Sequence, residues 1–440
     1  MKEIPHYEIE FGADGRLINE QQEASLAKAV SGGRTTLFVF AHGWNNSPGK
    51  ARELFRRFFA TVHDALPSRA ESPVATVGVI WPSMRWPDEQ DPTASSGGAA
   101  SIHAAAADAT QDNVFQVLRS VFPAGAEQEA LGQLETLLTA RPRDTAALRV
   151  FQEQLAVLAA GPDASAAVED QGEKALLADD PEPLFDAYAD LSPYVTEGGA
   201  AALGDPWKRV WNGAREAMRG ASYYAMKKRA GIVGRDGLGP LLGRLSAIEN
   251  VRVHLIGHSF GARLVSFSLS GLPRSAAGRT SPVKSMFLVQ GAFSHFTFAR
   301  ALPFHQEGGA LAGEQQRVDG PIVVTHSTHD LALADLYPRA SLISGQSAAA
   351  RHNLLYRWGA MGWDGAQEVA AASAYVGPVG TAYALSPSGF LNLDCNKLIK
   401  DGHRPSGAHS DIIHPELGWV AVAAAGLGAR DAAGPTPSQP

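Results

Sequence analysis

Cysteine is nearly absent from the sequence, since Cys395 is the only one among 440 residues. A single thiol cannot form an intrachain disulfide, which excludes the small folds that depend on a disulfide framework. An excess of positive charge is also absent, because 38 Lys and Arg residues stand against 45 Asp and Glu, for a net charge of −7. Proteins that bind nucleic acid usually carry a strongly basic face, so we expect no nucleic-acid partner.

Long apolar runs are lacking as well. No stretch approaches the ~20 apolar residues of a membrane-spanning helix, so we expect no integral membrane segment. The first residues, 1–8, lack the basic start and apolar stretch of a secretory signal. These features predict a cytoplasmic location, and a protein exported without a cleaved signal would share them. No feature indicates an oligomeric state.

Short apolar runs followed by turn residues predict buried strands. These runs are 36–41, 77–81, 251–256, 285–289 and 321–325, with a further strand-like run at 390–395. Strands that are apolar throughout are typical of a parallel sheet covered on both faces by helices. One such helix is evident after the first run, where Ser47 can cap it and Pro48 suits its first turn. The predicted fold class is therefore α/β, with a mostly parallel, doubly wound sheet.

A segment of different composition separates the run ending at Trp81 from the run starting at Val251. It is rich in Ala, Leu, Glu and Gln, and it carries helical periodicity at 113–121 and 127–139. At ~160 residues it is too long for a plain connection, so we predict a mainly helical insertion, or cap, over 88–249. The alternative is a mostly disordered acidic insert.

This insertion divides the chain into three predicted parts. The sheet domain is discontinuous, formed by 1–87 and 250–430, with the insertion at 88–249 between its two halves. The residues at 431–440, three of which are proline, predict a disordered tail.

The motif Gly257-His258-Ser259-Phe260-Gly261 carries the first chemical signal. Gly-x-Ser-x-Gly alone is weak evidence, but here a strand precedes it and a helix-compatible run, 262–267, follows it. Strand, sharp turn and helix together predict a nucleophile elbow with an exposed Ser259 hydroxyl. The flanking glycines let the strand and the helix approach closely. The alternative is a glycine-rich turn that serves packing only.

At this motif the chain resembles the α/β-hydrolase family, over 35–86 and 251–427. The resemblance implies an α/β-hydrolase fold and a serine esterase or lipase that cleaves carboxylic esters without a cofactor or metal. It also implies a triad in the chain order Ser, acid, His. The insertion is a departure from the family, because it precedes the nucleophile strand, whereas family lids commonly follow the next strand.

By this resemblance the acid lies in a loop after a late strand, where Asp330 follows the run at 321–325. Asp335, one turn into the next helical segment, is the second choice. The family keeps its base between the last strand and the last helix, and there His409 is the first choice. The alternatives to His409 are His414 and His403.

An acyl-transfer site also needs two donors for the oxyanion. The resemblance assigns one to the N–H of Phe260, after the nucleophile. The His-Gly-Trp loop at 42–44 resembles the oxyanion loop of family esterases and implies the N–H of Trp44 as the second donor. We expect the residues bordering the substrate to include Gly43, His258, Tyr223 and Tyr224.

Other functions compete with ester hydrolysis. The predicted substrate is a small-molecule or lipid ester, but a serine peptidase, amidase or thioesterase would use the same acyl-enzyme route. A hydrolase fold used only for binding is the alternative from a different class. A metal site formed by His326, His329, Asp330, His409, Asp411 and His414 is disfavoured, because the His-x-x-His pattern in a loop lacks the glutamate and helix of the zinc signature.

Overall fold

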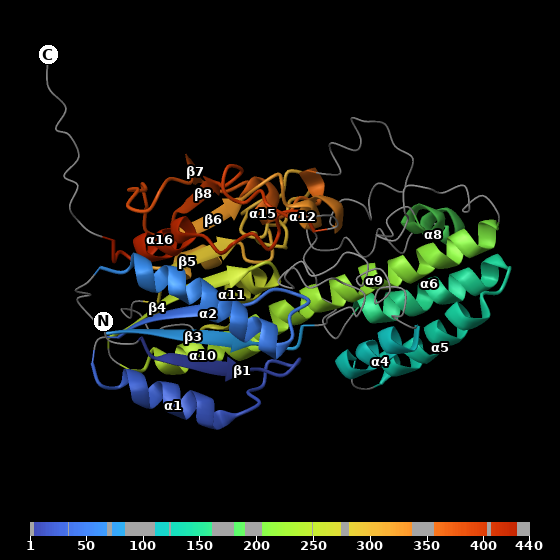
Figure 1. The fold of residues 1–440 in the computed structure, drawn as a ribbon, viewed down its shortest axis with the longest axis horizontal. Helices are drawn as coiled ribbons and strands as arrows, with labels where there is room; N and C mark the ends of the chain where they lie inside the picture. The colour runs from blue at the N-terminus through green and yellow to red at the C-terminus, as the bar shows by residue number, and fades with distance from the viewer. Residues whose placement is uncertain are drawn as a thin grey trace, which may run out of the picture.

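The computed structural model contains an eight-stranded sheet in which every strand pair is parallel (Figure 1). The residues described are 4–33, 35–67, 73–83, 111–122, 125–160, 180–189, 205–248, 250–273, 281–336, 356–402 and 406–428. The strand order is β1-β3-β2-β4-β5-β6-β8-β7. The predicted α/β class with a parallel sheet is therefore confirmed.

The strands follow the apolar runs of the sequence, with two additions at the edges. Their bounds are β1 His6–Glu10, β2 Thr35–Ala41, β3 Val74–Ile80, β4 Val251–His258, β5 Val283–Val289, β6 Ile322–His326, β7 Ala371–Tyr375 and β8 Phe390–Asp394. The sequence analysis did not predict β1 or β7. Both are edge strands that carry polar or small residues and are only partly buried, so they lack the continuous apolar pattern of the interior strands.

Helices cover both faces of the sheet. On one face α2 (Pro48–Ala65) packs against Phe40 of β2, and α16 (Pro415–Ala424) packs against α2 and β5. On the other, α1 (Glu20–Val30), α10 (Gly239–Leu245) and α11 (Phe260–Gly271) pack against the alternate residues of the strands. Alternation of side chains along each strand supplies both apolar faces. Each fully buried large side chain in these layers contributes about 1.5–3 kcal/mol.

The helix after β2 forms as its sequence predicts. Ser47 is the N-cap and its side chain accepts a hydrogen bond from Lys50 N–H, with Pro48 in the first turn. The apolar stripe of α2 lies against the sheet, and Phe55 and Phe58 are fully buried. Short elements complete the chain: the 3₁₀ helix η4 (Glu314–Arg317), α12 (Leu331–Leu336) and α15 (Met361–Asp364).

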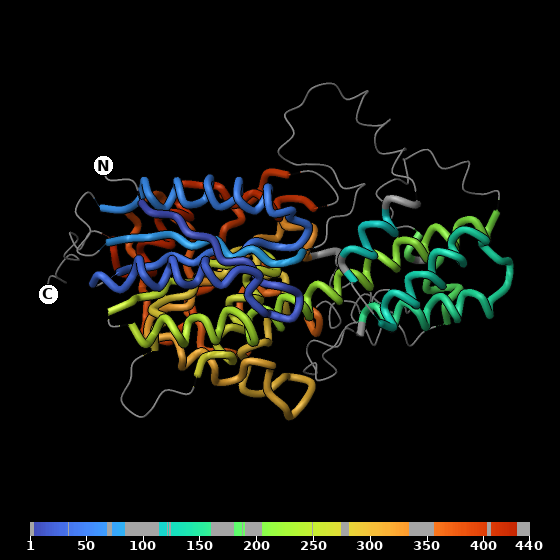
Figure 2. Tube along the Cα trace, turned by 90° about the horizontal axis from the view of Figure 1, so that it is seen from below, coloured from blue at the N-terminus to red at the C-terminus, as the bar shows by residue number. Residues whose placement is uncertain are grey.

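A group of helices lies between β3 and β4 in the sequence, and we call it the helical unit. It comprises α4 (Gln111–Val121), α5 (Ala126–Ala140), α6 (Thr145–Ala160), α8 (Pro181–Ala189) and the first part of α9 (Pro206–Ile232). Trp211 of α9 and Phe185 of α8 both pack edge-on against Phe151 of α6, which fixes the three helices together. Figures 1 and 2 show this unit extending beyond the carboxyl ends of the strands.

Several predicted boundaries lie outside the described residues. These are the start of the insertion near residue 88, its end at residue 249, and the tail at 431–440. None of the described helices combines the length and the apolar character that a membrane span requires.

Helix α9 connects the helical unit to the sheet. It continues into a π-helical segment, η3 (Val233–Leu238), and then into α10 and β4. Along this path the chain crosses α11, where Arg263 Nε donates to the carbonyl oxygen of Lys227 at 2.8 Å. Gly234 permits the crossing, because a Cβ there would lie 2.1 Å from the Leu264 carbonyl oxygen.

We expect Gly234→Ala to lower the free energy of unfolding by about 1–3 kcal/mol, since the added methyl group forces η3 away from α11. Gly132→Ala is the matched control, because Gly132 lies within α5 and a Cβ there meets nothing within 4 Å. That control should raise stability by about 0.5–1 kcal/mol. Chemical denaturation followed by circular dichroism measures both, and equal effects would contradict this account of the crossing.

Candidate active site

Ser259 lies at the turn between β4 and α11, at the edge of the sheet where the strands end. Its φ of 58° and ψ of −123° are rare for a residue with a side chain and cost about 1–3 kcal/mol. Its N–H donates to the Val289 carbonyl oxygen at 3.1 Å, which holds the turn against β5. Gly261 is required here, because a Cβ on it would lie 2.0 Å from the Ala41 carbonyl oxygen of β2.

His409 connects Ser259 to Asp330. Its Nε2 lies 2.8 Å from Ser259 Oγ, and its Nδ1 lies 2.7 Å from Asp330 Oδ2. Asp330 follows β6 and His409 lies between β8 and α16, so the three side chains come from three separate connections. Because the carboxylate accepts the Nδ1 hydrogen, Nε2 of the neutral imidazole is free to accept a proton from the serine hydroxyl.

The alternative acid and bases have other positions. His414 is the N-cap residue of α16, and its Nε2 lies 2.8 Å from Asp411 Oδ1 rather than near Ser259. Asp335 belongs to α12, and its side chain lies outside the described part of the structure, as does all of His403. The structure thus brings Ser259, Asp330 and His409 together, and His414 takes no part in that arrangement.

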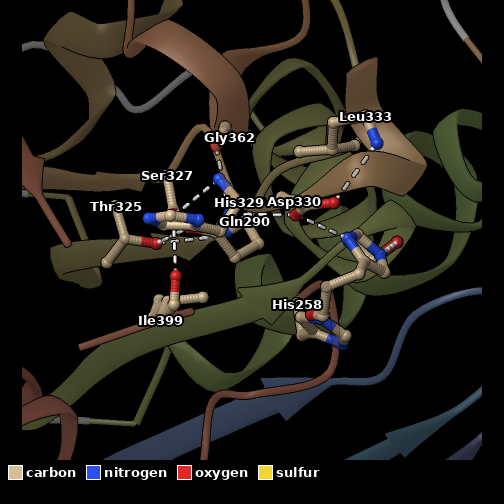
Figure 3. A network of polar contacts seen from close by, with 11 residues as sticks. His258, Gln290, Thr325, Ser327, His329, Asp330, Leu333, Gly362 and Ile399 are labelled. Atoms are coloured by element: carbon tan, nitrogen blue, oxygen red, sulfur yellow. Dashed lines mark hydrogen bonds and ion pairs between the residues drawn. The ribbon is translucent and has the colours of Figure 1, made fainter. Parts of the chain in front are cut away.

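Asp330 is fully buried and receives two further hydrogen bonds (Figure 3). Leu333 N–H donates to Oδ1 at 3.2 Å, and Gln290 Nε2 donates to Oδ2 at 2.9 Å. The sequence analysis did not single out Gln290. The signal that could have found it is a polar residue directly after a buried strand, β5, at the same edge of the sheet as Asp330.

The loop after β2 passes directly over Ser259. A Cβ on Gly43 would lie 2.7 Å from Ser259 Cβ and 3.2 Å from its Oγ, so only glycine allows this approach. The Gly43 carbonyl oxygen accepts hydrogen bonds from His42 Nδ1 at 2.8 Å and from Asn46 Nδ2 at 3.2 Å. In a planar trans peptide the following N–H, that of Trp44, points the opposite way.

Two backbone N–H groups therefore lie beside Ser259, from Trp44 and from Phe260. Phe260 is the first residue of α11, and N–H groups in a first helical turn have no intrahelical acceptor. Within the described residues neither N–H donates a backbone hydrogen bond. Such a pair can hold an oxygen that gains negative charge, and the start of α11 adds the favourable end of its helix dipole.

Neutral histidines support both loops of the site. Trp81 N–H donates to His42 Nε2 at 3.3 Å, so the Nδ1 atom of His42 carries the hydrogen given to Gly43. Burial lowers the pKa of His42 to about 4. His258 Nε2 donates to the His409 carbonyl oxygen at 2.9 Å. Burial, assisted by the charge of a protonated His409, lowers the pKa of His258 to about 3.

The predicted substrate-binding residues divide into two groups. Gly43 contacts Ser259, and His258 contacts the loop that carries His409. Among the described residues, the His258 ring makes one hydrogen bond, which is to His409. Tyr223 and Tyr224 come from α9. The Tyr223 ring lies 4.7 Å from the Phe260 ring and 5.6 Å from the Trp44 ring, so α9 reaches both residues that supply the N–H groups.

No cluster of three or more His, Cys, Asp or Glu side chains that could hold a metal ion occurs among the described residues. No family model, curated protein or solved structure matches this chain.

The buried histidines predict how stability depends on pH. Burial also lowers the pKa of His254 in β4, to about 3, and in an unfolded chain all three rings protonate near 6.5. Between these values the unfolded chain binds protons that the folded chain does not. The free energy of unfolding should therefore fall as the pH drops from 6.5 toward 4.

His254 contacts Ser285 and not Ser259. Replacing it therefore removes one of the three protons that the unfolded chain binds in this pH range. We expect His254→Phe to reduce the slope of unfolding free energy against pH by up to about 1.4 kcal/mol per pH unit in that window. Urea denaturation at a series of pH values measures the slope. An unchanged slope would show that His254 protonates equally in both states.

Proposed function

We propose that this chain is a serine hydrolase of the α/β-hydrolase type that cleaves carboxylic esters through an acyl-enzyme intermediate. The observation that carries the proposal is the His409 ring, which bridges Ser259 Oγ at 2.8 Å and Asp330 Oδ2 at 2.7 Å. A nucleophile, a base and an orienting carboxylate in hydrogen-bonding sequence are the geometric requirement for serine nucleophilic catalysis.

The order of elements supports the family assignment. The loop after β2 borders the turn after β4, and the connections after β6 and β8 bring in the acid and the base. The residues follow the chain order Ser, acid, His that the family uses, on a parallel sheet with helices on both faces. The helical unit precedes the nucleophile strand, which remains a difference from the usual place of family lids.

In the proposed first half-reaction His409 Nε2 takes the Ser259 proton while Oγ attacks the ester carbonyl carbon. Asp330 keeps the Nδ1 hydrogen in place and stabilises the imidazolium. The carbonyl oxygen becomes negative and accepts hydrogen bonds from Trp44 N–H and Phe260 N–H. The tetrahedral intermediate then collapses, and the alkoxide leaves with the proton from His409.

The second half-reaction returns the enzyme to its starting state. Water takes the place of the alcohol, gives its proton to His409, and attacks the acyl carbon. The same two N–H groups hold the second oxyanion, and Ser259 Oγ recovers its proton as the carboxylic acid leaves. No cofactor enters either half.

The substrate we assign is a small-molecule or lipid ester. The rings of Tyr223, Trp44 and Phe260 contact one another beside the two N–H groups, so the surroundings of the reacting carbonyl are aromatic. Aromatic surroundings favour an apolar acyl or alcohol group over a charged one.

Ser259→Ala should abolish hydrolysis of p-nitrophenyl acyl esters, because the other groups cannot form an acyl-enzyme. We expect the rate to fall by at least about 10⁴-fold, with the thermal unfolding midpoint changed little. A fluorophosphonate probe should label the natural chain at Ser259 and leave the variant unlabelled. If the natural chain neither turns over esters nor takes the label, the binding-protein alternative replaces this proposal.

Matched acyl esters and acyl anilides distinguish the esterase from a peptidase or amidase. The ester should be the faster substrate at every chain length, because the alcohol is the better leaving group. Faster cleavage of the anilides would reassign the chain to amide hydrolysis by the same residues.

His409→Ala and His414→Ala, made side by side, test the base. Because only His409 contacts Ser259 Oγ, its loss should reduce kcat by about 10⁴-fold or more. His414 contacts Asp411, so its loss should leave kcat within a few-fold and affect mainly stability. The reverse pattern of rates would identify His414 as the base.

A further inference from the structure

Gln290 follows β5 directly, in the strand position between Ser259 after β4 and Asp330 after β6. It is fully buried and has a φ of +46°, a left-handed conformation that is uncommon for a residue with a long side chain. A strained conformation persists only where the surrounding contacts hold it in place. Gln290 is held by hydrogen bonds of both its backbone and its side chain.

The side-chain amide of Gln290 is fully engaged. Nε2 donates to Asp330 Oδ2 at 2.9 Å and to the Gly362 carbonyl oxygen at 3.1 Å, while Oε1 accepts from Thr325 Oγ1 at 3.0 Å. Its backbone N–H donates to the same Thr325 hydroxyl oxygen at 3.0 Å. The amide can adopt only this orientation, because the reverse would set Oε1 against a carboxylate and a carbonyl.

These contacts place a defined donor on the oxygen that His409 uses. Asp330 Oδ2 receives both His409 Nδ1 and Gln290 Nε2, and Oδ1 receives Leu333 N–H. Figure 3 shows Gln290 between Thr325 on one side and Asp330 on the other, so Thr325 and Gly362 fix the amide and the amide fixes the carboxylate.

We infer that Gln290 is a positioning residue for the hydrolase, acting on His409 through Asp330. The inference rests on the proposed function for its kinetic consequence. With the amide present, the carboxylate cannot rotate about its Cβ–Cγ bond without losing a hydrogen bond to a charged group. Part of the charge on Oδ2 is also neutralised, which limits how strongly Asp330 stabilises the imidazolium of His409.

Gln290→Met tests this directly, since Met has a similar volume and length but no donor. We expect kcat on an acyl ester to fall by about 10- to 100-fold, the effect of losing a hydrogen bond to a charged group, with KM within about 2-fold. The acid limb of the kcat/KM profile should move to higher pH, because a carboxylate without the amide donor stabilises the imidazolium form of His409 more strongly.

Thr297→Val is the matched control. Thr297 is also buried on the connection after β5, and its hydroxyl donates to the Ser294 carbonyl oxygen at 2.8 Å without contacting Asp330. It should leave kcat and the acid limb unchanged. A Gln290→Met variant with the natural chain's kcat and acid limb would overturn the inference, because a merely structural amide would change stability alone.

Asp330→Asn completes the test. If Gln290 acts through Asp330, Gln290→Met should reduce kcat by less than about 3-fold in an Asp330→Asn background, instead of its full effect. Equal effects in both backgrounds would contradict the proposed route.

Gln290→Glu covers the case in which the Met variant does not fold. Its buried carboxyl donates while protonated, so its kcat/KM relative to the natural chain should fall as the pH rises, and a constant ratio would overturn the inference.

One readout is independent of turnover. The hydrogen between His409 Nδ1 and Asp330 Oδ2 should give a low-field proton resonance that is absent from His409→Ala and shifted in Gln290→Met. If no ester is hydrolysed by the natural chain, the proposed function fails while this resonance still tests the contact. If the natural chain is active and the resonance is unmoved by Gln290→Met, only the positioning role fails.

Discussion

Parallel pairing of the strands is the constraint on which the rest of this structure depends. When all strands run the same way, every chain segment that follows a strand emerges at one edge of the sheet. Ser259, Gln290, Asp330 and His409 all lie on such segments. Adjacent strands are about 4.8 Å apart, so β4 and β8, three positions apart in the sheet order, are separated by about 14 Å. The connection between β8 and α16 must reach back over β6 and β5 for His409 to meet Ser259.

Burial imposes the second constraint, because polar groups removed from water need partners. Asp330 has no exposed surface, and an unpaired carboxylate there would be strongly unfavourable. Three donors surround it, and the amide of Gln290 has its own partners in turn. The loop after β2 follows the same rule with His42 and Asn46. The geometry around Ser259 is thus held by buried polar groups, because losing any of their hydrogen bonds would leave a polar group unpaired.

The interior strands and the turn at Ser259 could be predicted because their patterns are local, whereas Asp330, His409 and the two N–H donors were predicted from the family resemblance. Buried strands read as apolar runs, and the elbow at Ser259 needs glycine on both sides. Edge strands β1 and β7 carry no such pattern, because one side of each faces solvent or loops. Gln290 escaped detection for another reason. A glutamine after a strand is common, and its importance arises from Thr325, Asp330 and Gly362, which are distant in sequence and meet it only after folding.

Helix α9 joins two regions with different duties. It has 27 residues and is therefore about 40 Å long. Its first part lies among the helices of the helical unit, and Tyr223 in its second half lies against Phe260 and Trp44. A continuous helix of this length behaves as a stiff rod. The side chains of Ser259, Asp330 and His409 come from the loops of the sheet, and α9 places the Tyr223 ring beside Phe260 and Trp44. The helical unit can therefore change in sequence, or be replaced, without altering the loops that carry Ser259, Asp330 and His409.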